Sequence, residues 1–129
     1  MAHDPGQLTT EMLAFLAERR LATLTTLRRD GSPHVVPVGF GYDPDARLVR
    51  VITPAGSQKA VNAARGGRAA VSQVDGARWL TLEGQVRLVT DLEGVARAIA
   101  AYTERYQPPR PRDDRVAIEI AVDRVLGRA

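Results

Sequence analysis

Alternating apolar and polar residues dominate this chain, and stretches of helical spacing separate the alternating runs. Because side chains on a strand point to opposite faces in turn, alternation over several residues predicts a strand with one buried face. The predicted strands cover residues 21–28, 34–42, 47–53, 68–74, 78–90 and 115–126. In the last run, Val116, Ile118, Ile120 and Val122 alternate with Ala117, Glu119 and Ala121.

Turn and breaker residues divide these strands. Asp30-Gly31 and Asp75-Gly76 are strong hairpin signals, so the strands on either side of each are expected to pair antiparallel. Pro37, within residues 34–42, predicts an edge strand, a bulge or a place where a ligand approaches the backbone. Gly84 predicts a kink or a bulge in residues 78–90.

The expected helices are short and lie between the strands. They cover residues 10–19, 57–65 and 91–106, with Thr9, Ser57 and Asp91 as N-caps. Six strands with hairpin turns and few helices predict a mainly β fold, a six-stranded antiparallel barrel with helices packed outside. The length of 129 residues fits one domain over 1–129, in which we expect residues 1–7 to be a flexible tail.

Composition removes several classes of function. There is no cysteine, which excludes disulfides and Cys-based metal sites, and two histidines are too few for a His-rich metal centre, so we expect no metal. A net charge of +3 and 5% aromatic residues argue against nucleic-acid binding. No apolar run approaches the roughly 20 residues of a membrane span, and no signal peptide is visible. We therefore expect a cytoplasmic protein without a membrane partner.

One of the 18 basic residues is lysine and the others are arginine. This residue, Lys59, stands in Gly56-Ser57-Gln58-Lys59, between a predicted strand and a predicted helix. Two interpretations are about equally supported. In the first, Ser57 serves only as a helix cap. In the second, its hydroxyl, the first amides of the helix and the Lys59 ammonium surround a phosphate.

Other residues could face a ligand, each with a plainer alternative. Arg50 lies between aliphatic residues on one face of its strand, and a solvated surface arginine is slightly favoured there over a ligand-binding one. Trp79, the only tryptophan, is either a core residue or a wall beside a planar ligand at the barrel rim. Tyr106, with Arg110 and Arg112, could line the mouth of a site. No catalytic triad or paired carboxylates stand out, so any chemistry is expected to belong to a bound cofactor.

Three motifs in order carry a resemblance to a known family. They are Asp30 to Phe40, then Val51-Ile52-Thr53 with Gly56 to Asn62, then Trp79 to Gly84. This order resembles the flavin and deazaflavin oxidoreductases of the split-barrel, pyridoxamine-phosphate-oxidase-like superfamily, which have an FMN-binding-like fold. Within it the chain is most similar to the branch that depends on coenzyme F420. Residues 56–62 and 72–80 look especially like F420-dependent biliverdin reductases.

The resemblance implies a homodimer of six-stranded split barrels, with two cofactor sites at the dimer interface. It places Thr53, Ser57, Gln58, Lys59, Asn62 and Arg50 around the phosphate and acidic tail of the cofactor. It places the backbone around Pro37 and Val38 against the ring, and brings Arg78 and Trp79 from the partner subunit. Tyr106, Arg110 and Arg112 would then border the substrate.

Two departures from the flavin-using oxidases of the superfamily narrow the function. Those oxidases commonly have Arg-Lys where this chain has Gln58-Lys59, and they end in a substrate-binding segment that is absent after Val125. Oxidation of pyridoxamine phosphate is therefore disfavoured. The resemblance implies an F420-dependent reductase that transfers a hydride to a conjugated acceptor, with biliverdin reduced to bilirubin as the first hypothesis. The alternatives are an FMN-dependent oxidoreductase and a non-enzymatic protein that binds F420 or a linear tetrapyrrole.

Overall fold

One antiparallel sheet organises the computed structural model, which describes residues 2–129. The strands follow the spatial order β3-β2-β6-β7-β8-β5-β4, and β1 adds to β8. They are β1 (Ala2–His3), β2 (Ala22–Leu27), β3 (Pro33–Val38), β4 (Gly41–Asp43), β5 (Leu48–Pro54), β6 (Arg68–Asp75), β7 (Arg78–Val89) and β8 (Arg115–Arg128). The helices are α1 (Thr10–Ala17), α2 (Gln58–Ala64) and α3 (Leu92–Arg105), with a 3-10 turn at Pro5–Gln7.

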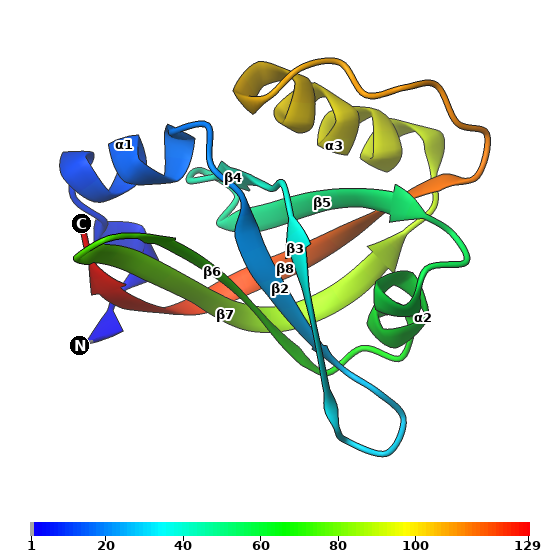
Figure 1. Cartoon of the computed structure of the whole chain (residues 1–129), viewed down its shortest axis with the longest axis horizontal. Helices are drawn as coiled ribbons and strands as arrows, with labels where there is room; N and C mark the ends of the chain where they lie inside the picture. The colour runs from blue at the N-terminus through cyan, green and yellow to red at the C-terminus, as the bar shows by residue number, and fades with distance from the viewer. Residues whose placement is uncertain (1) are drawn as a thin grey trace.

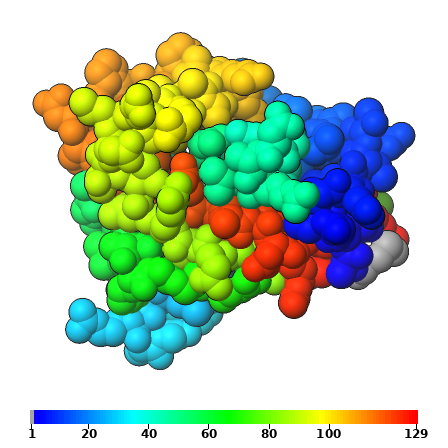
Figure 2. Space-filling model, turned by 180° about the vertical axis from the view of Figure 1, so that it is seen from behind, coloured from blue at the N-terminus to red at the C-terminus, as the bar shows by residue number. Residues whose placement is uncertain are grey.

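The sheet curves around the core but does not close, since β3 and β4 stand at the two ends of the order of paired strands. In Figure 1, α3 runs along β5, while α1 and α2 lie at opposite ends of the sheet. The mainly β architecture with flanking helices is thus confirmed. The hairpin between β2 and β3 projects from the body of the molecule, as the space-filling view also shows (Figure 2).

The expected count of six strands is wrong. The predicted strand 34–42 ends at Val38 and resumes at Gly41, because the intervening backbone is bonded by side chains of α3 rather than by another strand. Residues 1–7 were expected to form a loose tail. Instead, Ala2 and His3 pair with β8, and the His3 ring bonds the carbonyl of Gly127 through Nε2 at 2.7 Å.

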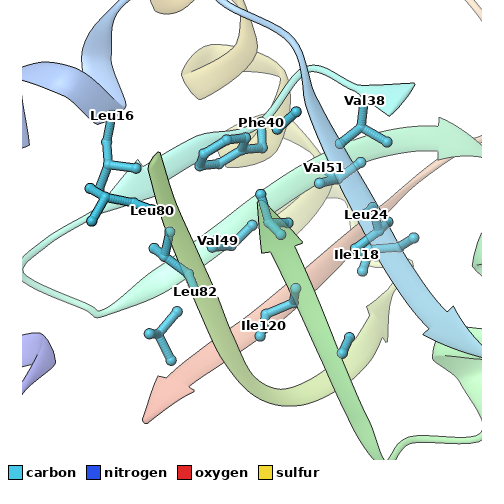
Figure 3. Packing of buried hydrophobic residues seen from close by; sticks show 14 of the residues in the cluster. Leu16, Leu24, Val38, Phe40, Val49, Val51, Leu80, Leu82, Ile118 and Ile120 are labelled. Carbon is cyan, nitrogen blue, oxygen red and sulfur yellow. The ribbon is translucent and has the colours of Figure 1, made fainter. Parts of the chain in front are cut away.

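The core lies inside the curved sheet and is closed at one end by α1 (Figure 3). Phe15, Leu24, Phe40, Leu80 and Ile118 have no exposed surface. Burying an aliphatic or aromatic side chain of this size contributes about 1.5–3 kcal/mol. This cluster fixes the strands, while the polar residues described below lie at its margins.

A bulge in β7 lets the sheet bend. The register with β8 shifts between Glu83 and Gly84, which confirms the expected irregularity. A Cβ at Gly84 would overlap the carbonyl oxygen of Ala121, so glycine is needed there for space rather than for its backbone angles. Within residues 2–129, no helix combines the length and the hydropathy that crossing a bilayer requires.

Candidate functional site

Two hydroxyl groups meet where β5 ends and α2 begins. Thr53 is buried and its Oγ1 lies 2.8 Å from Ser57 Oγ, while Ser57 Oγ accepts the Ala60 N–H at 3.2 Å. Ser57 is therefore the cap of α2, as its sequence position predicts. Lys59 follows in the first turn of the helix. We call Thr53, Ser57, Gln58, Lys59 and Asn62 the Lys59 cluster.

The Lys59 ammonium has no carboxylate within 4.0 Å in the part of the chain that the structure describes. The side chain is half-buried, and this loss of hydration lowers its pKa below the usual value. Partial burial of an unpaired cation is costly, and an anion beside it would offset that cost. The arrangement of one ammonium and two hydroxyls fits a phosphate group.

The rest of the cluster is a polar network that ties α2 to the β2–β3 hairpin. Gln58 Nε2 donates to Asn62 Oδ1 at 2.7 Å, and buried Asn62 donates from Nδ2 to Thr26 Oγ1 at 3.0 Å. Arg65 Nη2 donates to Asn62 Oδ1 at 3.0 Å and to the Leu27 carbonyl at 2.7 Å. Gln58 and Asn62 thus hold the helix in place, and their amides are largely used within the chain.

The β3 strand presents an edge without a paired strand among residues 2–129, and Pro37 and Val38 lie at its end. Pro37 is exposed and Val38 is buried. Pro37 therefore occupies an edge strand, one of the settings that its presence predicts. His34 lies opposite Thr26, and its Nδ1 is buried without a hydrogen-bond partner in the described chain. Nothing in the sequence pattern marks that burial.

The loop before β8 runs beside the Lys59 cluster. The Ala55 N–H donates to the Asp114 carbonyl at 2.7 Å, which joins the two loops. Arg110 and Arg112 are exposed on this loop, and Arg112 pairs with Asp114 at 2.9 Å. Arg110 is thus exposed to solvent, whereas Arg112 already has a carboxylate partner.

Arg50 points away from the cluster. It is three residues before Thr53 on β5 and so lies on the opposite face of the strand. Its guanidinium pairs with Asp43 at 3.0 Å and lies 3.7 Å from Glu119, and only 11% of the side chain is exposed. The interpretation as a solvated surface arginine is wrong, because the side chain is largely buried and paired with Asp43. The ligand-binding role that the resemblance implies stays a prediction.

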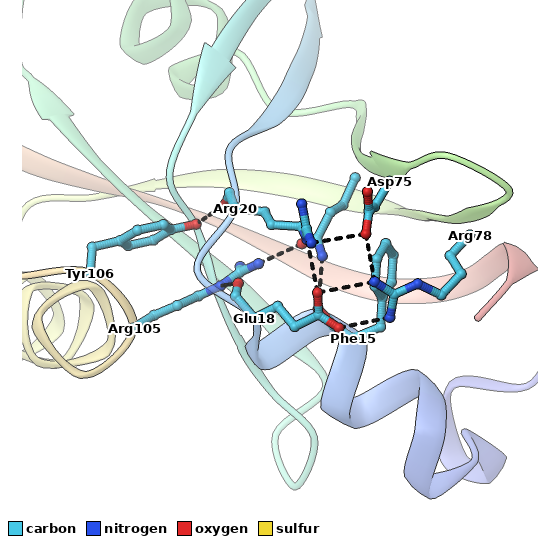
Figure 4. Close-up of polar contacts among 8 residues, drawn as sticks. Phe15, Glu18, Arg20, Asp75, Arg78, Arg105 and Tyr106 are labelled. Carbon is cyan, nitrogen blue, oxygen red and sulfur yellow. Dashed lines mark hydrogen bonds and ion pairs between the residues drawn. The ribbon is translucent and has the colours of Figure 1, made fainter.

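Arg78 and Trp79 begin β7, at the end of the sheet near α1. The Arg78 guanidinium donates to Glu18 at 2.7 and 3.2 Å and to Asp75 at 2.6 Å, and it stacks on the Phe15 ring (Figure 4). Trp79 is partly buried on the next position of the strand. A single chain therefore does not group these two residues with Lys59, whereas the resemblance assigns them to the partner's site.

Ion pairs around Glu18 are expected to make stability depend on pH. Hydrogen bonds from Arg78 and then Arg20 lower the Glu18 pKa from 4.5 to about 2. A carboxylate with a depressed folded-state pKa stabilises the fold above its unfolded-state pKa, and that contribution is lost as the pH falls from about 4.5 toward 2. Thermal unfolding of wild type and Glu18→Gln should therefore differ most at neutral pH and converge near pH 2. A difference in melting temperature that does not change with pH would contradict this assignment.

Tyr106 does not line an opening in this chain. Its hydroxyl accepts the Phe40 N–H at 3.2 Å and donates to the Arg20 carbonyl at 2.6 Å. Burial raises its pKa, which keeps the phenol protonated and able to donate at neutral pH. Both bonds of the hydroxyl are made within the chain, which gives Tyr106 a structural role, and its expected place at a substrate mouth stays a prediction.

Comparison with known proteins agrees with this architecture. Residues 8–129 match the family described as pyridoxamine 5'-phosphate oxidase. An F420H2-dependent biliverdin reductase from Mycobacterium tuberculosis is 55% identical over 129 residues, which are 100% of this chain and 94% of that protein.

Solved structures with lower sequence identity to this chain have the same fold. A conserved hypothetical protein from Mycobacterium tuberculosis has a TM-score of 0.79 and 26% identity, over 94% of this chain and 84% of that one. A structure described as an F420 reductase has a TM-score of 0.74 and 25% identity, over 92% of this chain and 98% of that one. By the extent of the family match and by these relatives, the chain belongs to the pyridoxamine 5'-phosphate oxidase family.

Proposed function

We propose that this protein is an F420-dependent reductase that converts biliverdin to bilirubin. One observation carries the proposal: the chain is 55% identical, over its whole length, to an F420H2-dependent biliverdin reductase. The Lys59 cluster supports the cofactor assignment, because a half-buried ammonium that has no carboxylate partner among residues 2–129 fits the phosphate that coenzyme F420 carries. We expect the enzyme to act in the cytoplasm.

In this proposal the chain binds and orients, and the cofactor carries the reactivity. When bound, reduced F420 supplies a hydride, which the tetrapyrrole accepts at its central methine bridge together with a proton at a pyrrole nitrogen. Lys59, Ser57 and Thr53 hold the phosphate, and the backbone edge at Pro37 and Val38 supports the ring. Holding both reactants in a fixed geometry lowers the entropic part of the barrier.

The arginines of the loop before β8 suit the acidic groups of both ligands. Arg110 and Arg112 are exposed beside the Lys59 cluster, where they can pair with the glutamyl tail of the cofactor or with the propionates of a linear tetrapyrrole. Arginine binds carboxylates through two parallel hydrogen bonds, so it orients them as well as attracting them.

We also propose a homodimer built on one face of the sheet. Cross-strand rows on the outer face join β3, β2 and β6 through positions without charge: Pro37, Thr23 and Ser72 in one row, and Val35, Thr25 and Ala70 in the next. Val35 is 55% exposed in the isolated chain. A surface of this composition suits a second copy of the chain, which would bring its own Trp79 to the site.

A charge placed on this face should weaken the dimer. Val35→Glu is expected to raise the dimer dissociation constant about tenfold or more, because the carboxylate would be desolvated at the interface. Leu92→Glu is the matched control, since Leu92 is 90% exposed on α3. Light scattering over a range of concentrations measures both variants. A wild-type monomer at high concentration, or equal behaviour of the two variants, would contradict the proposed interface.

Cofactor choice tests the proposed function against its nearest alternative. Purified protein is titrated with F420 and with FMN in parallel, followed by fluorescence or absorbance of the ligand. We expect F420 to bind at least about tenfold more tightly, which corresponds to about 1.4 kcal/mol. Preference for FMN would instead make this an FMN-dependent member of the family.

A further inference from the structure

The short segment between β3 and β4 has its hydrogen bonds made by side chains. The Phe40 N–H donates to the Tyr106 hydroxyl at 3.2 Å, and the Phe40 carbonyl accepts from Arg105 Nη1 at 2.6 Å. Buried main-chain groups normally find such partners on a neighbouring strand. Here two consecutive residues at the end of α3 replace that strand, and we call Arg105 and Tyr106 the Phe40 clamp.

The two clamp residues also bond to the chain between α1 and β2. The Tyr106 hydroxyl donates to the Arg20 carbonyl at 2.6 Å, and Arg105 Nε donates to the Glu18 carbonyl at 2.8 Å (Figure 4). Arg105 Nη2 donates to Gln73 Oε1 at 2.5 Å. Gln73 is fully buried on β6, so the guanidinium connects α3 to the interior of the sheet. The clamp therefore cannot shift without disturbing several elements.

Packing around the segment leaves little space for movement. A Cβ on Gly39 would lie 2.9 Å from the Tyr106 ring and 3.0 Å from the Tyr102 ring. The Arg105 guanidinium stacks 4.5 Å from the centre of the Phe40 ring, which has no exposed surface. Only glycine fits at position 39 with these rings in place.

This arrangement lies two residues beyond Val38, at the end of the β3 edge. We propose that Arg105 and Tyr106 are positioning residues of the cofactor site, which hold Phe40 and so fix the β3 edge against which the cofactor ring rests. The inference rests on the proposed function. Neither side chain contacts the ring in this account, because both act through the backbone of Phe40. Sequence reasoning had assigned Tyr106 a different role, at the substrate mouth.

The test distinguishes effects on the ring-binding edge from effects on the phosphate site by comparing ligands with and without the phosphate. Tyr106→Phe removes the hydroxyl and keeps the ring that packs on Gly39. Its affinity is measured for F420 and for a deazaflavin with a ribityl chain but no phosphate or tail. We expect affinity for both ligands to fall about fivefold, since coupling through a packed backbone has this order of magnitude. Lys59→Ala should instead weaken only the binding of F420.

A second measurement needs no ligand. Hydrogen exchange of the Phe40 amide should become about tenfold faster in Tyr106→Phe, because the amide loses its acceptor. Tyr42→Phe is the matched control: the Tyr42 hydroxyl is buried without a hydrogen-bond partner among residues 2–129, so its removal should change neither exchange nor affinity. Gly39→Ala, which pushes against the same rings, should weaken the binding of both ligands as Tyr106→Phe does.

The outcomes distinguish this inference from the proposed function. An equal loss of affinity for both ligands with faster Phe40 exchange supports the positioning role. Unchanged affinity for the phosphate-free ligand in Tyr106→Phe overturns it, even if the variant is less stable, and leaves the proposed function standing. A wild-type protein that binds neither ligand overturns the proposed function and this inference with it.

Discussion

Replacing Lys59 by alanine is expected to weaken F420 binding by about 1.5–3 kcal/mol, or about 10- to 150-fold in Kd. This is the range for losing a hydrogen bond to a charged group, and no other lysine exists in the chain to compensate. The fold should be little affected, because Lys59 forms no ion pair within residues 2–129. Isothermal titration with F420 measures the change.

A matched control separates a specific contact from a change in net charge. Arg97→Ala also removes one positive charge, from an exposed residue of α3. Its Kd for F420 should stay within about twofold of wild type, since an exposed charge outside the site is screened by salt. Equal losses of F420 affinity in the two variants would mean that Lys59 acts only through long-range electrostatics. An unchanged Kd in Lys59→Ala would mean that Lys59 does not belong to the site.

Replacing Arg50 by methionine should cost about 1–3 kcal/mol of folding free energy and leave F420 binding nearly unchanged. Glu119, whose side chain is only 2% exposed, would keep Arg87 as a partner but would lose the second positive charge that lies 3.7 Å away. Asp43 would lose its pairing with Arg50 as well. Chemical denaturation measures the stability, and the Kd for F420 is measured on the folded variant under native conditions.

A double variant shows whether the cost comes from the pairing with Glu119. If Glu119 is first changed to glutamine, Arg50→Met should cost less than it does in the wild type, because Arg50 then has no charge at position 119 to lose. Equal costs in the two backgrounds would mean that Arg50 and Glu119 are not coupled. A loss of F420 affinity above about tenfold in Arg50→Met would return Arg50 to the cofactor site that the resemblance implies.

Local signals predicted much of the fold. The Asp30-Gly31 and Asp75-Gly76 turns join β2 to β3 and β6 to β7, as expected. Asp91 caps α3 by accepting the Gly94 N–H at 2.9 Å, and the bulge falls at Gly84. These features depend on a few neighbouring residues, so the sequence pattern alone is sufficient to locate them.

Features that depend on distant residues could not be predicted in this way. The strand break at Phe40 requires Tyr106, which is 66 residues later in the chain. Alternation along β8 predicted an outward-facing Glu119, yet residues 116–120 are all buried because α3 packs over this part of the sheet. The ion pairs of Arg50 and Arg78 are likewise long-range contacts.

The candidate site likewise contains some residues that the sequence identifies and others that it does not. Ser57 was identifiable because a helix cap has a recognisable sequence, and Lys59 because it is the single lysine. The burial of His34 Nδ1 left no mark in the sequence, since it depends on how β2 and β3 pair and on what surrounds the ring in the folded chain. The ligand-binding roles of the cluster stay predictions until binding is measured.

Turnover with the two proposed reactants tests the central claim most directly. Reduced F420 and biliverdin are mixed with catalytic amounts of the protein under anaerobic conditions, and absorbance follows both compounds. The account predicts that biliverdin is lost and bilirubin formed in equal amounts, with one oxidised F420 for each and a rate that falls in Lys59→Ala. Tight binding of F420 with no loss of biliverdin would contradict the proposed reaction.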